Sequence, residues 1–422
     1  MFIIFRSHSI SLFTLNLKNR CREIVLRDVI IVGGGPSGCF TGKKLAEKGF
    51  DVVIIEEDKQ IGHPMCCAGI VGDEGMKEVG LNPSKWSLNE LREGVVYSPD
   101  NEPVGISRGK LEAHCIERSD FDKALAISAT DEGADIRLSS KCSDISRDEE
   151  GVSVKVKGKD EVEELRGKII VGADGANSTV ARNFNLIKEF SPLAGAQAEV
   201  IGKTESKAAN IFFNNEWTEH FFAWIVPAGE IYRVGLCDRG NNVRKNLEKF
   251  IKRNPVLQEN SQEKIVRYTT DIIPKSGSRK IFDERVVLVG DAGGQVKPLT
   301  GGGIYMGLSC AEIASQVITK GLENEPKKEI LKEYEKRVDE KFGKEFEIGN
   351  RIMKMLSEME NKDISNFFNL LKKPYVKNMI TEEFVFDEHS NLLKEMSKKI
   401  PRLVNHFGLK DSLKYIKWLL SS

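Results

Sequence analysis

The stretch DVIIVGGGPSGCFTGKKLAEKGFDVVIIE, residues 28–56, decides the fold. An apolar run at 29–32 enters a turn rich in glycine, a helix is expected over 41–48, and a second apolar run follows at 52–55. Strand, turn, helix and strand in this order predict a βαβ unit, whose two strands lie parallel in a buried sheet.

Three glycines of the turn, Gly33, Gly35 and Gly38, have the spacing G-x-G-x-x-G. The first permits the tight turn, the second lets a pyrophosphate approach the backbone, and the third lets helix and strand pack closely. With Ser37 in the same turn, the pattern predicts a dinucleotide phosphate at a helix start. This Rossmann-type pattern leaves NAD and FAD equally open.

An acidic residue closes the unit and makes the glycine pattern more specific. Glu56 ends the second strand, where a carboxylate can accept a hydrogen bond from a ribose hydroxyl. Glu57 is the neighbouring alternative for that contact.

The bulk composition excludes several classes of function. The chain of 422 residues has 63 basic and 63 acidic side chains, so no overall field favours a nucleic acid partner. Its eight cysteines form no C-x-x-C pair, so neither a metal site nor a disulfide framework is expected, and a reducing cytoplasm fits best. No run of roughly 20 apolar residues is present to cross a bilayer, and the leader lacks the pattern of a signal peptide.

Segments far from the glycine turn are expected to join the same sheet. The apolar runs 169–171 and 286–289 are each followed by Gly and Asp, which is typical of strand ends. From about residue 326 onward the sequence is amphipathic at helical spacing. Aromatic, alternating stretches between the two apolar runs indicate antiparallel strands, at 212–213, 221–226 and 232–236.

Two short segments resemble the para-hydroxybenzoate hydroxylase-type flavoproteins and imply that the dinucleotide is FAD. GADGANS at 172–178 resembles their DG motif, and GDAG at 290–293 resembles their GD motif. The resemblance implies that Asp291 binds the ribitol of the flavin, and that the helix start at Gly303 and Ile304 faces the isoalloxazine. A helix dipole in that position stabilises reduced, anionic flavin.

The same resemblance implies two further contacts with FAD. Arg118, in the segment ERSDFD at 117–122, matches the arginine of an R-x-x-F/L-D segment that reaches the FAD from a helix start. Cys142, near a strand end, is expected to bring backbone groups to the adenine.

Within that superfamily, two segments resemble the geranylgeranyl reductase family, which includes the archaeal digeranylgeranylglycerophospholipid reductases. VGDAGGQVKPLTGGGI at 289–304 is the most specific match. GHPMCCAGIV at 62–71 is similar to the family's G-x-P-V-x-C-A/G-G segment, which implies that Cys67 and Ala68 lie beside the flavin.

A third segment, FAWIVP at 222–227, resembles the family's Y-x-W-x-F-P signature in the sheet that covers the flavin. Trp224 and Pro227 match, whereas Phe222 and Val226 depart. Losing the tyrosine hydroxyl at Phe222 removes a polar group, but an aromatic wall for a polyprenyl chain survives the change. Phe222, Trp224 and Pro227 are therefore the expected substrate contacts.

The resemblance implies an FAD-dependent oxidoreductase acting on CH–CH groups. The family saturates isolated alkenes of geranylgeranyl chains, which needs a proton on one alkene carbon and a hydride from reduced flavin on the other. Cys67 is the candidate catalytic residue, as a proton donor, a flavin contact or a packing residue. His63 is left out of the site, because a lone loop histidine more often only forms hydrogen bonds.

The reductant stays open at this point. No second G-x-G-x-x-G lies in a strand–turn–helix context that would hold a nicotinamide. Electrons are therefore expected either from NAD(P)H that binds transiently or from a ferredoxin-like donor protein.

The expected fold is α/β: a Rossmann-type FAD-binding domain with an inserted antiparallel-sheet substrate domain and a C-terminal helical region. The expected boundaries are 1–27 for an N-terminal extension, 28–190 and 281–325 for the FAD-binding domain, 191–280 for the substrate domain and 326–422 for the helical region.

The last segment, 391–422, predicts contact with a membrane surface. It ends in an apolar run with Trp418, and such basic, amphipathic helices lie in the interfacial plane of anionic membranes. A cytoplasmic protein attached peripherally to the membrane is expected, with a basic solvated face as the alternative. The basic residues are Lys394, Lys398, Lys399, Arg402, Lys410, Lys414 and Lys417, against Glu395 and Asp411.

Two rival functions use the same features. A flavin monooxygenase or halogenase shares the FAD framework, but the Cys67 segment and the run 298–304 disfavour it, and the W-x-W-x-I-P signature of halogenases is absent. The second rival is a non-catalytic prenyl-lipid carrier that keeps FAD as a structural ligand.

Overall fold

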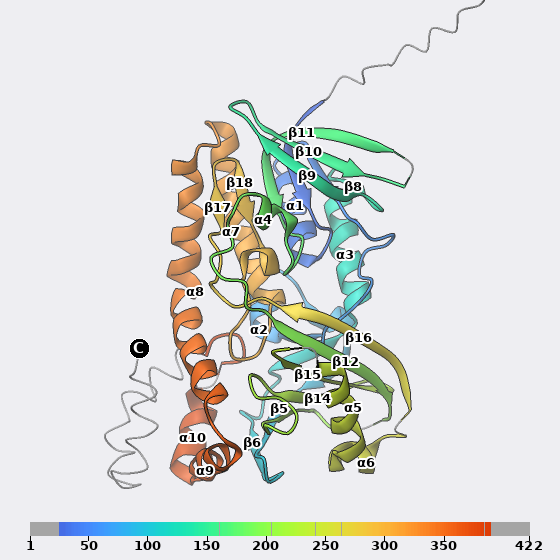
Figure 1. Ribbon diagram of the computed structural model, residues 1–422, viewed down its shortest axis with the longest axis vertical. Coiled ribbons are helices and arrows are strands. Elements are labelled where there is room, and N and C mark those ends of the chain that lie inside the picture. Colours follow the sequence, from blue (N-terminus) through green and yellow to red (C-terminus); the bar gives the residue numbers. More distant parts are fainter. Residues whose placement is uncertain are drawn as a thin grey trace, which may run out of the picture.

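The computed structural model describes residues 25–389, except 160, 204, 241, 263 and 384. Figure 1 shows one large sheet above another, with two long helices, α7 (Ile304–Glu323) and α8 (Lys328–Ser357), alongside. A parallel sheet, a mainly antiparallel second sheet and C-terminal helices confirm the expected α/β class.

The first sheet brings together the segments that the sequence predicted to share it. Among the described residues it has eight strands, in the order β17-β18-β11-β1-β2-β8, with β10 pairing β11 and β9. Val29 lies opposite both Val52 and Ile169, and the neighbouring strands are parallel in both pairs. The strands are β1 (Leu26–Val32), β2 (Val52–Ile55), β8 (Asp135–Arg137), β9 (Lys141–Arg147), β10 (Val152–Lys157), β11 (Val162–Gly172), β17 (Phe282–Asp283) and β18 (Val286–Leu288).

Beside this sheet, helix α1 (Pro36–Ala46) packs against both α3 (Arg118–Asp131) and α7. The helix expected over 41–48 begins earlier, at Pro36, because proline fits the first helical position, where its missing N–H is not needed. The apolar faces of β1, β2 and β11 are fully buried against α7 and α8 on one side.

The second sheet has seven strands among the described residues, in the order β16-β12-β15-β14-β13-β5-β6. Its pairs are antiparallel except β13 with β5. Two of its strands, β5 and β6, come from 93–106, a segment that the sequence analysis placed with the FAD-binding residues. The strands are β5 (Glu93–Tyr97), β6 (Pro103–Ile106), β12 (Leu193–Ile201), β13 (Ala208–Phe212), β14 (Ala223–Ala228), β15 (Ile231–Asp238) and β16 (Ile265–Ile273).

The aromatic stretches depart from the strand prediction at one place. The strand expected over 221–226 begins only at Ala223, so Phe213, Phe221 and Phe222 lie in the connection between β13 and β14. Their rings pack on one another there, with Phe221 and Phe222 stacked at a centroid distance of 4.1 Å. These aromatic contacts hold the segment together with scattered hydrogen bonds, such as those from the Phe213 N–H to the Tyr97 carbonyl at 3.1 Å and from the Phe221 N–H to the Thr218 hydroxyl at 3.2 Å.

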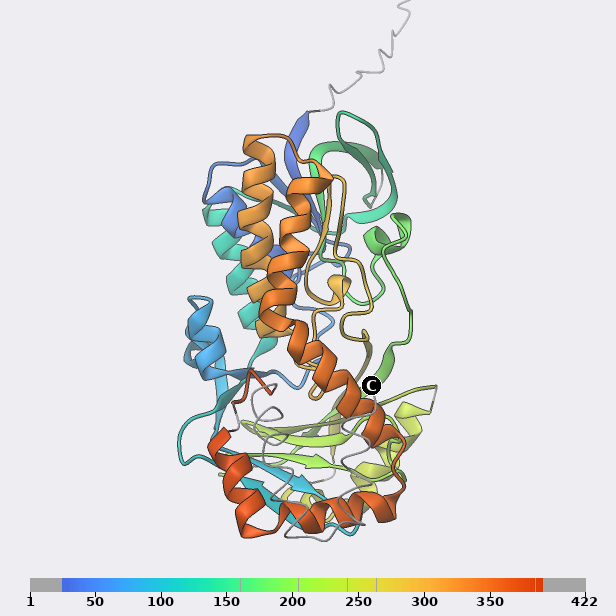
Figure 2. The ribbon, with the colours of Figure 1, turned by 90° about the vertical axis from the view of Figure 1, so that its left-hand side faces the viewer.

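The C-terminal part is helical, as expected. In Figure 2, α8 crosses from beside the parallel sheet to the second sheet, beneath which α9 (Asn361–Leu371) and α10 (Pro374–Glu383) lie. No helix among the described residues is long and apolar enough to cross a membrane. The basic segment 391–422 and most of the predicted N-terminal extension, 1–24, lie outside the described residues.

The remaining elements form a small sheet and short helices. The strands of the small sheet have the order β3-β7-β4, and β7 leads directly into α3. These remaining elements are β3 (Ile70–Gly72), α2 (Asp73–Glu78), η1 (Pro83–Trp86), β4 (Ser87–Leu91), β7 (Ala113–Ile116), α4 (Thr179–Asn183), α5 (Val243–Arg253), α6 (Pro255–Asn260) and η2 (Gly290–Gly293).

Candidate functional site

A cavity of about 940 Å³ is lined by residues of both large sheets and of the loops that follow them. Gly38 and Pro227 are outside its lining, and Pro227 instead pairs with Tyr232 within the second sheet. The sequence-predicted site residues that line it are Gly33, Gly35, Ser37, Glu56, Cys67, Ala68, Arg118, Cys142, Phe222, Trp224, Asp291, Gly303 and Ile304.

The glycine turn shows why side chains are missing there. Gly33 has φ of +105°, and a Cβ on it would lie 2.3 Å from the carbonyl oxygen of Ala173. A Cβ on Gly38 would lie 2.0 Å from the carbonyl oxygen of Gly33, so this glycine permits the helix to pack on the turn. Beside Gly35, in contrast, the space is open. An anion can therefore approach the backbone at the start of α1.

The acid at the end of β2 faces this turn. One carboxylate oxygen of Glu56 accepts a hydrogen bond from the Gly34 N–H at 2.7 Å, and the other accepts one from the Asp58 N–H at 2.8 Å. Burial raises the pKa of Glu56, and these two hydrogen bonds partly oppose the shift. Glu57, the alternative, is exposed and forms an ion pair with Lys141 at 2.6 Å. The geometry therefore favours Glu56 as the acid that belongs to the turn.

The segment that resembles the DG motif is also part of the cavity wall. Asp174 accepts hydrogen bonds from the Ser178 hydroxyl at 2.6 Å and the Thr179 N–H at 2.6 Å, and so stabilises the start of α4. Burial raises its pKa, against these hydrogen bonds. Cys142, on β9, also lines the cavity, and burial raises the pKa of its thiol to about 12.

The segment that resembles the GD motif meets the glycine turn through Ser37. The Ser37 hydroxyl oxygen lies where side chains on Gly290 and Gly307 would be, 2.5 and 2.4 Å from their would-be Cβ positions. These close approaches show that α1, η2 and α7 converge at Ser37.

Asp291 faces the cavity at the start of α7. A Cβ on Gly303 would lie 2.9 Å from its carboxylate, so the carboxylate and the helix start are in close contact. Burial and the neighbouring Asp271 carboxylate raise the pKa of Asp291 to about 6, against the effect of Arg118 and Arg279.

Arg118 begins α3 and connects two parts of the cavity. Its guanidinium donates to both carboxylate oxygens of Asp122, at 2.9 and 2.8 Å. Burial alone would lower the pKa of Arg118, but Asp122 and the Cys67 sulfur together raise it well above its usual range. The cation is therefore held next to Cys67.

The cysteine loop is tied to the aromatic end of the cavity by Gln197. Its amide nitrogen donates to the carbonyl oxygen of Cys67 at 3.0 Å, and its amide oxygen accepts from the Trp224 indole N–H at 3.3 Å. The Gly69 N–H donates to the Cys67 sulfur at 3.3 Å. Cys67 thus has Arg118 on one side and Trp224, through Gln197, on the other.

The cavity wall formed by the second sheet is rich in aromatic and aliphatic side chains, although Glu93, Ser107, Arg108 and Glu112 also line the cavity. Phe222 stacks on Phe221 and meets Trp224 edge to face at 6.3 Å between ring centroids. The other apolar residues of this part come from the second sheet, the loop before α7 and the C-terminal segment, namely Val96, Ile106, Ala209, Ile211, Phe213, Leu299 and Phe386.

Several cavity residues were missed by the sequence analysis. Lys297 and Asp271 line the cavity, as do Phe386 and His389, which belong to the segment after α10. Lys297 lies in the run 289–304 that carried the resemblance, so the sequence could have placed it near the flavin. Its burial could not be read from the sequence. Nothing in the local sequence around 386–389 indicates that this segment returns to the cavity.

The residues fit FAD. An open cradle at Gly35, a carboxylate at Glu56 and a second carboxylate at a helix start lie in one cavity, where they could hold the phosphates, a ribose and the flavin. The aromatic part beyond Cys67 leaves a second, apolar region.

Comparison with known proteins agrees with this arrangement. The model of the family described as FAD binding domain matches residues 27–341. Digeranylgeranylglycerophospholipid reductase 2 of Methanopyrus kandleri is 30% identical over 394 residues, which cover 90% of this chain and 98% of that protein. The uncharacterised protein MJ1520 of Methanocaldococcus jannaschii is 35% identical over 378 residues, covering 88% and 95% of the two chains.

The fold is shared with a solved structure. A geranylgeranyl bacteriochlorophyll reductase-like protein of Thermoplasma acidophilum superposes with a TM-score of 0.80 at 22% identity, covering 92% of this chain and 99% of that one. At this identity the likeness concerns the fold.

Proposed function

Because the chain belongs to the FAD-binding domain family and, within it, to the geranylgeranyl reductases, we propose that it reduces double bonds of geranylgeranyl chains. FAD is its cofactor. The substrates are archaeal-type membrane lipid precursors, 2,3-bis-O-geranylgeranylglycerophospholipids, as the name of the Methanopyrus kandleri relative implies for that protein. The observation that carries the proposal is a single cavity that joins the dinucleotide cradle to an aromatic, apolar region at Cys67.

The chain's own residues have distinct tasks in this reaction. FAD, when bound and reduced, would supply the hydride. Glu56, Asp291 and the start of α1 hold it, and Arg118 contributes a fixed positive charge. An unactivated alkene offers no carbonyl to polarise, so the apolar region has to orient the double bond and exclude water.

Cys67 is the proposed catalytic residue. It lines the cavity between Arg118 and the Gln197–Trp224 pair, which supports a position between flavin and prenyl chain. Its thiol is a proton donor of the kind that reduction of an alkene needs. Electrons reach the flavin from NAD(P)H or from a ferredoxin-like protein.

The protein is proposed to work in the cytoplasm at the membrane surface. The basic excess of 391–422 supports this, because a peripheral enzyme can take up a lipid's chains without removing the whole molecule from the bilayer.

Anaerobic reduction with dithionite, followed by a geranylgeranyl lipid, tests the function. Reoxidation of the flavin together with a mass gain of two hydrogens per double bond is expected. A hydroxylated product that depends on oxygen would instead indicate a monooxygenase, and absence of reoxidation by lipid or oxygen would indicate a carrier.

A further inference from the structure

Arg233 is a fully buried arginine at the face of the second sheet that meets the cysteine loop. It lies on β15 and is 0% exposed. Across the sheet it is paired with Glu199 of β12, which in turn is paired with Arg267 of β16, so the three side chains lie in a row on one face. A charge removed from water to this extent requires partners that compensate for its lost hydration.

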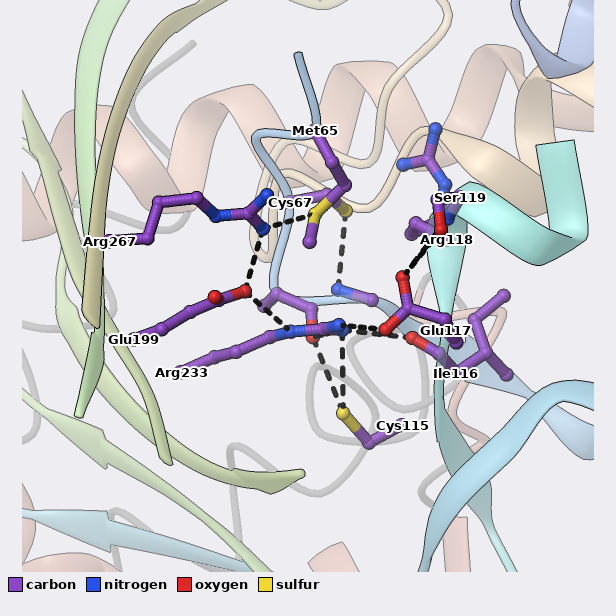
Figure 3. A network of polar contacts seen from close by, with 12 residues as sticks. Met65, Cys67, Cys115, Ile116, Glu117, Arg118, Ser119, Glu199, Arg233 and Arg267 are labelled. Carbon is purple, nitrogen blue, oxygen red and sulfur yellow. Dashed lines mark hydrogen bonds and ion pairs between the residues drawn. The ribbon is translucent and has the colours of Figure 1, made fainter. Parts of the chain in front are cut away.

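Those partners are backbone carbonyls as well as carboxylates (Figure 3). The Nη1 of Arg233 donates to the carbonyl oxygens of Ile116 at 2.8 Å and Ala68 at 3.2 Å, and its Nη2 donates to the Glu117 carboxylate at 3.2 Å. Glu199 is more distant, at 3.9 Å from Nε. One planar group thus reaches two segments that are far apart in the chain. We call these three contacts the Arg233 clamp.

Both segments are next to proposed site residues in the sequence. Ala68 follows Cys67, and Ile116 ends β7 just before the helix that begins with Arg118. Glu117, the third partner, also accepts hydrogen bonds from the N–H and hydroxyl of Ser119, and so caps this helix. The clamp therefore joins the cysteine loop to the start of α3.

The cysteine loop is shaped to admit Arg233. Gly69 has φ of +76°, and a Cβ on it would lie 2.3 Å from Nη1 of Arg233 and 2.7 Å from the Ile116 carbonyl oxygen. The Gly69 N–H donates to the Cys67 sulfur. Gly69 therefore contacts both the Arg233 guanidinium and the Cys67 thiol, and its lack of a side chain makes room for the guanidinium.

The Nε of Arg233 is buried and has no hydrogen-bond partner among the described residues. An unsatisfied buried donor is costly. The guanidinium is therefore oriented so that it bonds the two carbonyls and Glu117, although this orientation leaves its Nε–H without an acceptor in the described part of the chain.

We propose that Arg233 is a positioning residue, which fixes Cys67 and Arg118 relative to one another by holding the carbonyls of Ala68 and Ile116. The clamp itself stands on contacts between protein groups, and only its importance for alkene reduction rests on the proposed function. Removing it frees the cysteine loop to move away from the start of α3.

The test compares Arg233→Met and Arg233→Lys with Arg267→Met as the matched control. Arg267 also pairs with Glu199, at 2.6 Å, and its Nη2 lies 3.9 Å from the Met65 sulfur of the cysteine loop, but it donates to neither carbonyl. Each variant is purified with FAD, and the alkylation rate of Cys67 by iodoacetamide is measured by peptide mapping, alongside the dissociation constant of FAD and the melting temperature. None of these readouts needs the lipid substrate.

Arg233→Met is expected to speed alkylation of Cys67 about tenfold and to weaken FAD binding, because local opening of a loop rises steeply when its tertiary contacts are lost. Arg233→Lys is expected to stay close to Arg233→Met, since one ammonium lacks the fork of donors. Arg267→Met is expected to alkylate like the wild type. Equal rates in both Met variants, or full restoration by lysine, would overturn the proposal.

If Arg233→Met does not fold, Gly69→Ala reaches the same contact from the other side. Its Cβ crowds both the Arg233 guanidinium and the Ile116 carbonyl oxygen while the arginine remains. Faster alkylation of Cys67 in this variant supports the clamp, and an unchanged rate contradicts it. If the wild-type protein shows normal alkylation of Cys67 and binds FAD but does not reduce the alkene, that result would count against the proposed function and not against the clamp.

Discussion

The ammonium of Lys297 lies 3.0 Å from the carboxylate of Asp387, and the two side chains are only 4% and 10% exposed. Lys297 also donates to the Phe386 carbonyl at 3.1 Å, and Asp387 accepts from the Gly75 N–H at 3.2 Å. A Cβ on Gly72 would lie 1.7 Å from this carboxylate. The segment after α10 is thus held against the loop before α7 and against α2, and its Phe386 becomes part of the cavity wall.

Asp387→Asn is predicted to lower the free energy of unfolding by roughly 3 kcal/mol, because it leaves the buried Lys297 ammonium without its counter-ion. Urea unfolding of the FAD-bound protein measures this. The control is Glu230→Gln, which breaks the exposed Lys203–Glu230 pair, 73% and 78% exposed, and is expected to change little. Similar losses in the two variants would contradict a special role of the buried pair.

The stability of the apoprotein is predicted to depend on Asp291 between about pH 4 and pH 6. Its pKa is raised to about 6, above the ordinary value of about 4, so the folded state binds the proton more tightly than the unfolded state. This contribution is present below about pH 4 and is lost as the pH rises through about 6. Asp291→Asn should therefore reduce the loss of stability between about pH 4 and pH 6. Melting curves across this range measure it, and parallel curves for wild type and variant would refute the assignment.

Cys67→Ala is predicted to keep FAD bound yet to lower turnover of the prenyl lipid about 100-fold, as loss of a positioned proton donor does. Flavin absorbance and single-turnover reoxidation of the reduced enzyme measure the two effects separately. Cys66→Ala is the control, because burial raises the pKa of that thiol to about 11 and it is not the residue proposed to donate. Unchanged turnover in Cys67→Ala with bound flavin would remove Cys67 from the mechanism.

Two glycines of the cavity wall are predicted to separate cofactor from substrate. A Cβ would meet open space at both Gly35 and Gly94. Gly35→Val fills the phosphate cradle and should abolish FAD binding. Gly94 lies in β5 opposite Ile106 and Ala209, which also line the cavity, so Gly94→Val should retain FAD and raise KM for the prenyl chain. Titration of each apoprotein with FAD measures cofactor binding. If both variants fail to bind FAD, the cavity does not have separate cofactor and substrate regions.

Deletion of the residues after Gly408 is predicted to reduce binding to anionic vesicles, because it removes Lys410, Lys414, Lys417 and Trp418. Each basic residue near such a surface contributes about 1 kcal/mol. Sedimentation with phosphatidylglycerol vesicles measures it. Neutral phosphatidylcholine vesicles are the control, and undiminished binding by the truncated chain would clear this segment of the role.

Local patterns were sufficient for the cofactor half of the protein. The spacing of Gly33, Gly35 and Gly38 between two apolar runs predicted the turn, the helix and the parallel strands, because the constraints on a phosphate turn act within a few residues. The position of Gly303 at a helix start was implied instead by the resemblance to known flavoproteins. The aromatic connection at Phe221 and Phe222 was mistaken for strand, since β-type residues can pack on one another outside a sheet.

Resemblance carried the prediction further along the chain than local pattern did. It indicated Arg118, Cys67 and Asp291 as neighbours of one flavin, and all three line the same cavity. It did not indicate Gln197 or Arg233, which connect these residues, because their effect depends on which loops pack against the second sheet. The domain boundaries remain a proposal, with β5 and β6 contributed to the second sheet from the first half of the chain.

The sequence by itself determined the fold class and the dinucleotide turn, because glycine spacing and the alternation of apolar residues act locally, and its resemblance to known flavoproteins at 172–178 and 290–293 identified the cofactor as FAD. Only the tertiary structure decided that Arg233 reaches the carbonyls of Ala68 and Ile116 and that Asp387 neutralises Lys297. A buried charge takes its partner from whatever segment folding brings within about 3 Å, and that neighbour is not written in the residues beside it.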